Sequence, residues 1–156
     1  NLTLYFEDRL TIQYQVQEML WIERIFEAEG IEEELSAYNP LIPDGHNLKC
    51  TAMLEFEDVD ERRRRLAQLV GVEDMVWACV EGHEKVYAIS NEDLERSTEE
   101  KTSAVHFMRF ELSGAMIAAL KSGATLSFGS DHENYREQTE VGNQTRASLL
   151  ADLDQA

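Results

Sequence analysis

Apolar and polar residues follow one another along the chain in short blocks of two different periods. Apolar runs with the length and alternation of strands predict strands at 2–6, 49–57, 75–80, 85–89, 102–112 and 124–128. Helical spacing of apolar residues predicts helices at 11–29, from Asp58 or Asp60 to Gly71, at 114–121 and at 145–153, with a short one near 91–95. Asp58 or Asp60 is expected to cap the second of these helices, and Ser113 the third. The chain is therefore expected to mix both kinds of element throughout its length.

The order of these elements favours one class of fold. The segment Glu81-Gly82-His83-Glu84 has the composition of a hairpin turn, and no glycine-rich phosphate loop follows any predicted strand. Strands joined by hairpins and short crossovers are typical of an α+β fold rather than of a doubly wound nucleotide fold. We predict a single α+β domain over residues 1–156, with a mainly antiparallel sheet packed against a long N-terminal helix and shorter helices.

The predicted helix at 11–29, with Gly30 as its C-terminal cap, has apolar residues on two opposite sides. One side carries Ile12, Val16, Met19, Leu20 and Phe26, and the other carries Tyr14, Trp21, Ile22 and Ile25. A helix that is apolar on two sides is expected to be covered by two layers. The sheet would cover one side, and the C-terminal helix, an absent N-terminal segment or a second subunit would cover the other.

Glu23 falls near the middle of the first apolar side of this helix. A carboxylate in such a place is costly unless it is paired or protonated. Glu23 is thus a candidate acid, base or metal ligand with a raised pKa. Two plainer interpretations stay open, namely a structural ion pair and a helix rotated so that Glu23 reaches water.

The predicted strand at 102–112 contains two further candidates. Alternation places His106 with apolar residues on one face, and Arg109 with Glu111 on the other. His106 is a candidate titrating group, or a core histidine that is hydrogen-bonded to backbone or carboxylate. Arg109 is a candidate ligand-binding residue, or the partner of a nearby carboxylate such as Glu111.

Asp131 and His132 follow the glycine-punctuated end of the last predicted strand, where loops often carry function. With Tyr135 they could bind an anion or a metal, although a turn stabilised by the aspartate is the plainer interpretation. The four histidines have no metal-ligand spacing. We therefore predict neither a metal site nor a cofactor.

The charge of the chain limits its partners. Asp and Glu number 31 against 14 Lys and Arg, which gives a net charge of −17. Such a field repels phosphate backbones and anionic lipids, so nucleic acid and membrane surfaces are not expected as partners. The one dense basic run, Arg62 to Arg65, is expected on the solvated face of its helix beside acidic neighbours, with docking to an acidic partner as the alternative.

The two cysteines and the start of the chain bear on its location. Cys50 and Cys79 lie in apolar strands without metal-ligand spacing, which is typical of buried thiols in a reducing compartment. No signal peptide or membrane span is visible, so we predict a cytoplasmic protein. The chain begins at Asn1 directly in a strand, and we expect that it lacks a native N-terminal segment.

Several stretches together resemble the bacterial family catalogued as domain of unknown function 3501. They are 4–9, 15–19, 23–27, 38–43, 93–96, 101–110 and 129–132 with Tyr135. Members of this family usually carry an additional N-terminal segment, and their genes often lie beside genes for rubrerythrin-like and iron–sulfur oxidoreductases. The resemblance thus implies a role in redox or peroxide metabolism, and it supplies no catalytic residues.

Two functions remain in competition. The first is a non-catalytic accessory protein that docks onto a rubrerythrin-like or iron–sulfur redox partner. In this function the chain could also act as a homodimer. The second is a small enzyme or a ligand- or metal-binding protein whose site gathers Glu23, His106, Arg109 and the Asp131–His132 pair. This second function requires that these side chains converge on one pocket.

Overall fold

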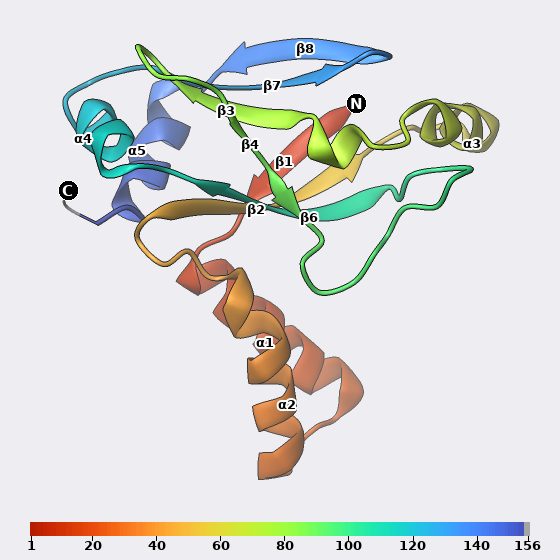
Figure 1. The fold of residues 1–156 in the computed structure, drawn as a ribbon. Coiled ribbons are helices and arrows are strands. Elements are labelled where there is room, and N and C mark those ends of the chain that lie inside the picture. Colours follow the sequence, from red (N-terminus) through yellow and green to blue (C-terminus); the bar gives the residue numbers. More distant parts are fainter. Residues whose placement is uncertain (155–156) are drawn as a thin grey trace.

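Two four-stranded antiparallel sheets, packed face to face, form the body of the molecule in the computed structural model, which describes residues 1–154 (Figure 1). The lower sheet has the order β1 (Leu2–Phe6), β2 (Asn47–Leu54), β6 (Val105–Glu111), β5 (Ile89–Ser90). The upper sheet has the order β4 (Val86–Tyr87), β3 (Val76–Val80), β7 (Leu126–His132), β8 (Tyr135–Glu140). The predicted α+β class and its antiparallel pairing are confirmed, with two sheets instead of one.

The main core lies between the two sheets. Alternate residues of β2 and β6 point inward, where they meet inward residues of β3 and β7. The ring of Phe128 lies 5.0 Å from that of Phe6 and 5.2 Å from that of Phe110, so aromatic contacts join the layers. The predicted parity of the 102–112 strand is correct, because His106 is buried and Arg109 lies on the outer face.

The segment predicted as one strand at 85–89 belongs to two sheets. Residues of β4 pair with β3 in the upper sheet, and residues of β5 pair with β6 in the lower one. The chain crosses between layers at Ala88, which is buried in the main core. A single apolar run therefore closes one side of the sandwich. The short helix predicted near 91–95 is not formed, since these residues make an irregular loop.

Short helices cover the two ends of the sandwich (Figure 1). At one end lie α4 (Gly114–Lys121) and α5 (Asn143–Ala151), and at the other lies α3 (Val59–Gln68), followed by the turn η2 (Val72–Asp74). As predicted, the side chains of Asp58 and Ser113 cap α3 and α4. The expected loop at Asp131–His132 is instead the end of β7, which forms a hairpin with β8.

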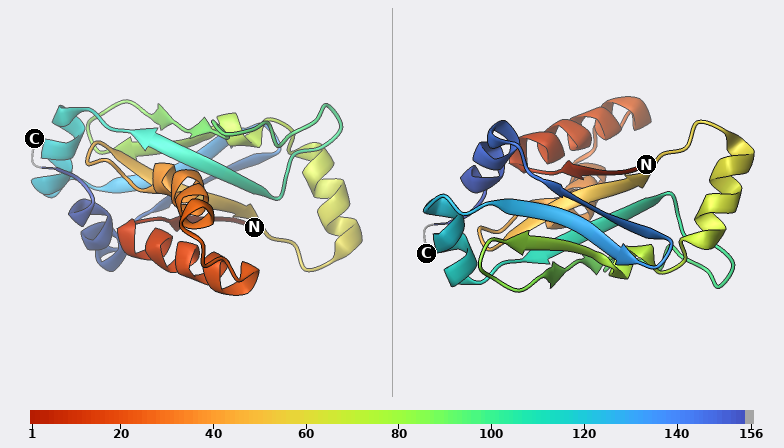
Figure 2. Two further views of the ribbon diagram at one scale, coloured as in Figure 1. Left: turned by 90° about the horizontal axis from the view of Figure 1, so that it is seen from below. Right: turned by 90° about the horizontal axis from the view of Figure 1, so that it is seen from above.

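The N-terminal helices project from the body as an antiparallel pair, α1 (Arg9–Glu23) and α2 (Ala28–Tyr38), followed by the turn η1 (Asn39–Leu41) (Figures 1 and 2). We name residues 9–38 the helical hairpin. The single helix predicted at 11–29 is therefore wrong at its end. Arg24 adopts a left-handed conformation (φ 55°) and its successor Ile25 donates its backbone N–H to the Leu20 carbonyl, which ends α1.

Gly30 lies inside α2 and is not the predicted C-terminal cap. A Cβ atom built on Gly30 would meet Cγ2 of Ile25 at 2.6 Å. The absence of a side chain thus permits close contact between the turn and α2. Among residues 1–154, none of the helices combines the length and the apolar character that crossing a bilayer requires.

Candidate functional site: the helical hairpin and the groove beside it

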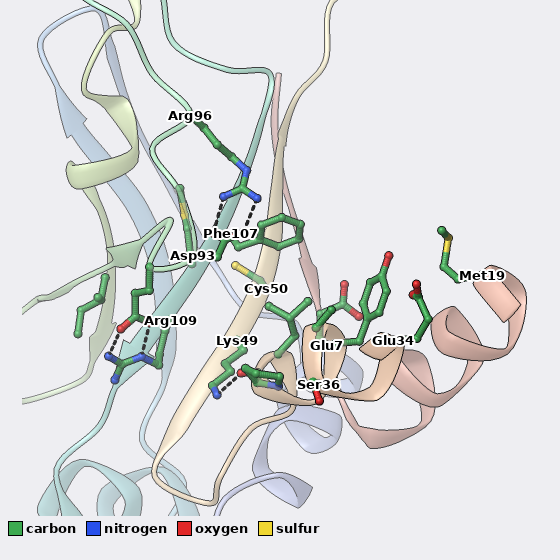
Figure 3. Close-up of a pocket in the computed structure, with 17 residues that line it drawn as sticks. Glu7, Met19, Glu34, Ser36, Lys49, Cys50, Asp93, Arg96, Phe107 and Arg109 are labelled. Atoms are coloured by element: carbon green, nitrogen blue, oxygen red, sulfur yellow. Dashed lines mark hydrogen bonds and ion pairs between the residues drawn. The ribbon is translucent and has the colours of Figure 1, made fainter. Parts of the chain in front are cut away.

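A groove of about 620 Å³ separates the helical hairpin from the body of the molecule (Figure 3). Its floor is the outer face of the lower sheet, its near wall is formed by α2 and η1, and its far wall is the loop after β5. The labelled side chains that line it are Glu7, Met19, Glu34, Ser36, Lys49, Cys50, Asp93, Arg96, Phe107 and Arg109. The groove contains one of the predicted site residues, Arg109.

Arg109 is fully engaged by carboxylates. Its Nε and Nη2 atoms donate to Glu92 over 2.9 and 2.8 Å, and its Nη1 atom donates to Glu111. These hydrogen bonds raise the pKa of Arg109 above its ordinary value, and the bond from Arg109 lowers the pKa of Glu92. A ligand carboxylate would compete with Glu92 and Glu111 for this guanidinium.

The other cations of the groove also have partners. Arg96 donates to both carboxylate oxygens of Asp93 over 2.6 Å and lies over the Phe107 ring, 4.6 Å from its centroid. The bonds from Arg96 lower the pKa of Asp93 to about 2. Lys49 donates its ammonium group to the Pro40 carbonyl over 2.7 Å, which fastens η1 to the sheet. The cations therefore stabilise the walls of the groove.

Behind the far wall lies a set of polar side chains that we name the His106 network: Glu73, Thr102 and His106 are buried, and Asn91 and Ser97 are half-buried. The Thr102 hydroxyl lies 3.1 Å from one oxygen of Glu73, and the Ser97 hydroxyl donates to the other. His106 Nε2 lies 2.9 Å from the Thr102 hydroxyl, and its Nδ1 lies 2.9 Å from the Asn91 amide nitrogen. The network joins η2, the loop after β5 and strand β6.

The hydrogen bonds fix which nitrogen of His106 carries the proton. The side-chain oxygen of Asn91 accepts the Phe107 backbone N–H, so its amide nitrogen donates to Nδ1 of His106. The proton is then on Nε2, which donates to the Ser103 carbonyl 3.0 Å away. Because the free lone pair points away from Thr102, His106 is not placed to act as a base toward that hydroxyl.

Burial lowers the pKa of His106, although the nearby Glu73 carboxylate acts in the opposite direction. His106 is 1% exposed, and Glu73 Oε2 lies 3.9 Å from its Nε2. The observed environment is that of a hydrogen-bonded core histidine, the plainer of the two sequence interpretations. Sequence reasoning missed Glu73, Asn91, Ser97 and Thr102. Its only signal was the expectation that His106 meets a backbone or carboxylate partner.

The residues Asp131, His132 and Tyr135 make structural contacts in the upper sheet. Asp131 accepts from Lys85 over 2.8 Å and from the Tyr87 hydroxyl over 2.7 Å, and these bonds lower its pKa to about 2. The ring of His132 lies 3.0 Å from the carbonyl of Val70 and accepts the Asn134 backbone N–H. The Tyr135 hydroxyl accepts the Leu2 backbone N–H across the two sheets.

The predicted site residues are not brought together. Glu23 is exposed at the C-terminal end of α1, whereas His106 lies inside the sandwich and Arg109 lies on the groove floor. Asp131 and His132 belong to the other sheet. Glu23 reaches water, which was one of the two plainer sequence interpretations, because this end of the helical hairpin is exposed. Within residues 1–154, no group of three or more His, Cys, Asp or Glu side chains is arranged to hold a metal ion.

Cys50 and Cys79 are both free thiols. Cys50 is buried in the main core, where burial raises the pKa of its thiol to about 12. The thiol is therefore protonated and unreactive at neutral pH.

The helical hairpin carries large apolar side chains that are mostly exposed, and those at its base, Leu10 and Tyr14, also line a cavity beside Tyr5 and Met53 of the lower sheet. The five highest exposed fractions among large hydrophobic side chains of the described chain are those of Trp21 (77%), Phe26 (75%), Leu10 (72%), Ile22 (64%) and Tyr14 (62%). Ile12 and Val16 are the buried residues of α1. Of the three alternatives for the second cover, the C-terminal helix is excluded, since α5 lies at the end of the sandwich (Figure 2).

Comparisons with known proteins identify a family and a similar structure, and neither has a described activity. A family model described as "Protein of unknown function (DUF3501)" matches residues 1–153. A crystal structure of a protein of unknown function from Burkholderia pseudomallei is similar, with 55% sequence identity and a TM-score of 0.91. The match covers 98% of this chain and 80% of that one. No protein of curated function matches the chain.

Proposed function

Because the chain belongs to the DUF3501 family, whose description names no activity, we propose a function from the geometry: a non-catalytic accessory protein that binds another protein through its helical hairpin. The observation that carries this proposal is the gathering of the five most exposed large hydrophobic side chains on one projecting element. Large apolar side chains gathered on an exposed surface mark sites of interaction with other molecules. Scattered single apolar residues would carry no such meaning.

The position of these side chains suits binding to a partner. Leu10, Tyr14 and Trp21 are spaced so that they share one side of α1, and Phe26 continues the surface past its end. The helical hairpin stands clear of the sandwich (Figures 1 and 2), so a partner can reach it from several directions. Two aromatic anchors, Tyr14 and Trp21, are of the residue types that dominate binding energy at interfaces.

The polar chemistry of the molecule supports a binding role over a catalytic one. His106, the best candidate for a titrating group, is buried, neutral and directed at a carbonyl. The arginines of the groove are neutralised by carboxylates. The Thr102 hydroxyl beside His106 faces the nitrogen that carries the proton, so this pair lacks the lone-pair geometry that activation of a nucleophile requires.

Ligand binding in the groove is a second candidate, favoured by its volume and by the Phe107 ring on its floor beside Arg109. A planar carboxylate could exchange with Glu92 on the Arg109 guanidinium. Arg109→Met would then abolish a ligand-induced thermal stabilisation that Glu57→Gln, a change remote from the groove, preserves. Equal stabilisation of both variants by the ligand would exclude the groove as its binding site.

The nature of the partner is a separate matter. The gene neighbourhood of the family suggests a rubrerythrin-like or iron–sulfur protein, and no contact within residues 1–154 bears on that choice. Cytoplasmic location would be consistent with such a partner and is likewise part of the proposal.

Site-specific photocrosslinking tests the proposal. A photoreactive phenylalanine analogue replaces Trp21 in the protein in its own cell, and a matched one replaces Tyr87, which is 45% exposed on β4 of the opposite sheet. We expect a saturable adduct with a second protein from position 21 only. That protein should bind the purified chain, and Trp21→Ser should weaken binding at least tenfold. No adduct from position 21 above that from position 87 would overturn the proposal.

A further inference from the structure

The end of the helical hairpin combines exposed apolar side chains with an excess of one charge. We name residues 21–34 the hairpin tip; it contains the last turn of α1, the connecting turn and the first turns of α2. Trp21, Ile22 and Phe26 are its exposed large hydrophobic residues. Its charged residues are one cation, Arg24, and six carboxylates, Glu23, Glu27, Glu29, Glu32, Glu33 and Glu34. The apolar side chains thus lie on an element dominated by negative charge.

These six carboxylates are not used by the fold. No hydrogen bond or ion pair within residues 1–154 involves any of their side chains, whereas Glu73, Glu92 and Asp93 each have partners. Glu29 and Glu33 stand four residues apart on α2, a spacing at which like charges repel. The carboxylates of the tip therefore repel one another without any ion pair to offset the repulsion, although Glu29 is favourably placed in the first turn of α2.

We infer that the hairpin tip inserts into an apolar groove, on a different protein, whose rim is lined with lysine and arginine. This inference rests on the proposed function and specifies its partner. Complementary charge would convert the unfavourable field of the tip into faster and more selective association. Nucleic acid and anionic lipid would be repelled by the same field.

A second copy of the chain does not provide the positive charge that would complement the tip. Two tips in contact would bring twelve carboxylates together, because each copy contributes its six. Like charges that face one another across an interface repel, which disfavours a homodimer through this surface. The carboxylates thus both select the partner and keep copies of this chain apart.

Two charge-matched variants test, without knowledge of the partner, whether the carboxylates of the tip keep copies of this chain apart. E23Q/E32Q/E33Q removes three charges from the tip, and E57Q/E84Q/E133Q removes three from exposed positions elsewhere. Each changes the net charge from −17 to −14. We expect sedimentation to show self-association of the tip variant at least tenfold stronger than that of the control. Adding Trp21→Ser should abolish it.

The unsubstituted chain should stay monomeric at about 10 mM salt and associate weakly at about 1 M, where charges are screened beyond about 3 Å. Equal self-association of the two triple variants, or a salt-independent dimer joined through position 21, would overturn the inference.

The affinity for the protein captured at position 21 tests whether the partner has a rim of lysine and arginine. The tip variant should bind at least tenfold more weakly than the control variant at low salt, and with a shallower salt dependence. If a partner is captured and both variants bind it equally, the basic rim is wrong and the docking function stands. If nothing is captured, the docking function fails, and the basic-rimmed partner fails with it.

Discussion

Carboxylates occupy two opposite environments in this molecule. Glu73 in the His106 network is buried and accepts bonds from Ser97 and Thr102, and His106 lies beside it. Five of the six glutamates of the hairpin tip are exposed and Glu34 is half-buried, and the side chains of all six lack a hydrogen bond or ion pair within residues 1–154. A buried charge must be satisfied within the fold, because water cannot reach it. An exposed one costs the fold little, and it remains available to a partner. The comparison predicts that one region governs stability and the other governs association.

The largest effect on stability is expected from Glu73→Ala. The substitution would leave the Ser97 and Thr102 hydroxyls without their buried acceptor, so the free energy of unfolding should fall by about 2–4 kcal/mol. Urea unfolding followed by circular dichroism measures the change, with Glu32→Ala in the tip as the matched control. A loss below about 0.5 kcal/mol would show that the network does not stabilise the fold.

The next effect is a pH dependence set by His106. Its folded pKa is below the ordinary value, so the unfolded chain binds the proton more readily. The resulting contribution to stability is complete above about pH 6.5 and is lost as the pH falls toward the folded pKa. Protonation would also place a donor on Nδ1 against the Asn91 amide. Urea unfolding between about pH 7.5 and 5 should therefore show a smaller loss in His106→Gln than in the unsubstituted chain. Identical pH profiles would contradict this role.

A smaller effect is expected from Arg109→Met on the groove floor. The substitution removes ion pairs with Glu92 and Glu111 that are partly exposed to solvent, so the cost should be about 1 kcal/mol or less. High salt should reduce the difference between the variant and the unsubstituted chain. A salt-independent loss several times larger would mean that Arg109 supports the fold as Glu73 does.

The smallest effect on stability is expected from Trp21→Ser. Trp21 is 77% exposed and contributes little buried area, so the free energy of unfolding should change by less than about 0.5 kcal/mol. Because Trp77 is buried and Trp21 is not, the variant should lose the red-edge component of tryptophan fluorescence. A large destabilisation would show that Trp21 packs within the complete protein and is not available to a partner.

The sequence patterns predicted those features that depend on neighbouring residues. Alternation at 102–112 correctly separated His106 from Arg109, because successive side chains of a strand must point to opposite faces. The caps at Asp58 and Ser113 were also readable, since a side-chain oxygen bonds to an N–H only three residues away. The family match confirms the resemblance found in the dispersed motifs.

The same patterns gave the wrong end for α1. No glycine or proline stands at Arg24, so nothing local marks the left-handed residue that ends the helix. The pattern predicts Gly30 as a helix cap, whereas in the structure Gly30 lies inside α2 and allows close contact with Ile25 of the connecting turn. The apolar residues at 21–26 have helical spacing, and spacing cannot show whether they are buried or exposed.

Sequence alone determined the α+β class, most strand positions, the parity of β6 and the acidic character that limits the partners. Tertiary structure alone decided that Glu73 meets His106 across 33 positions and that the helical hairpin projects from the sandwich. The difference has one physical cause. Local patterns fix backbone conformation and the face that a side chain takes, whereas its partners depend on the packing of segments distant in sequence.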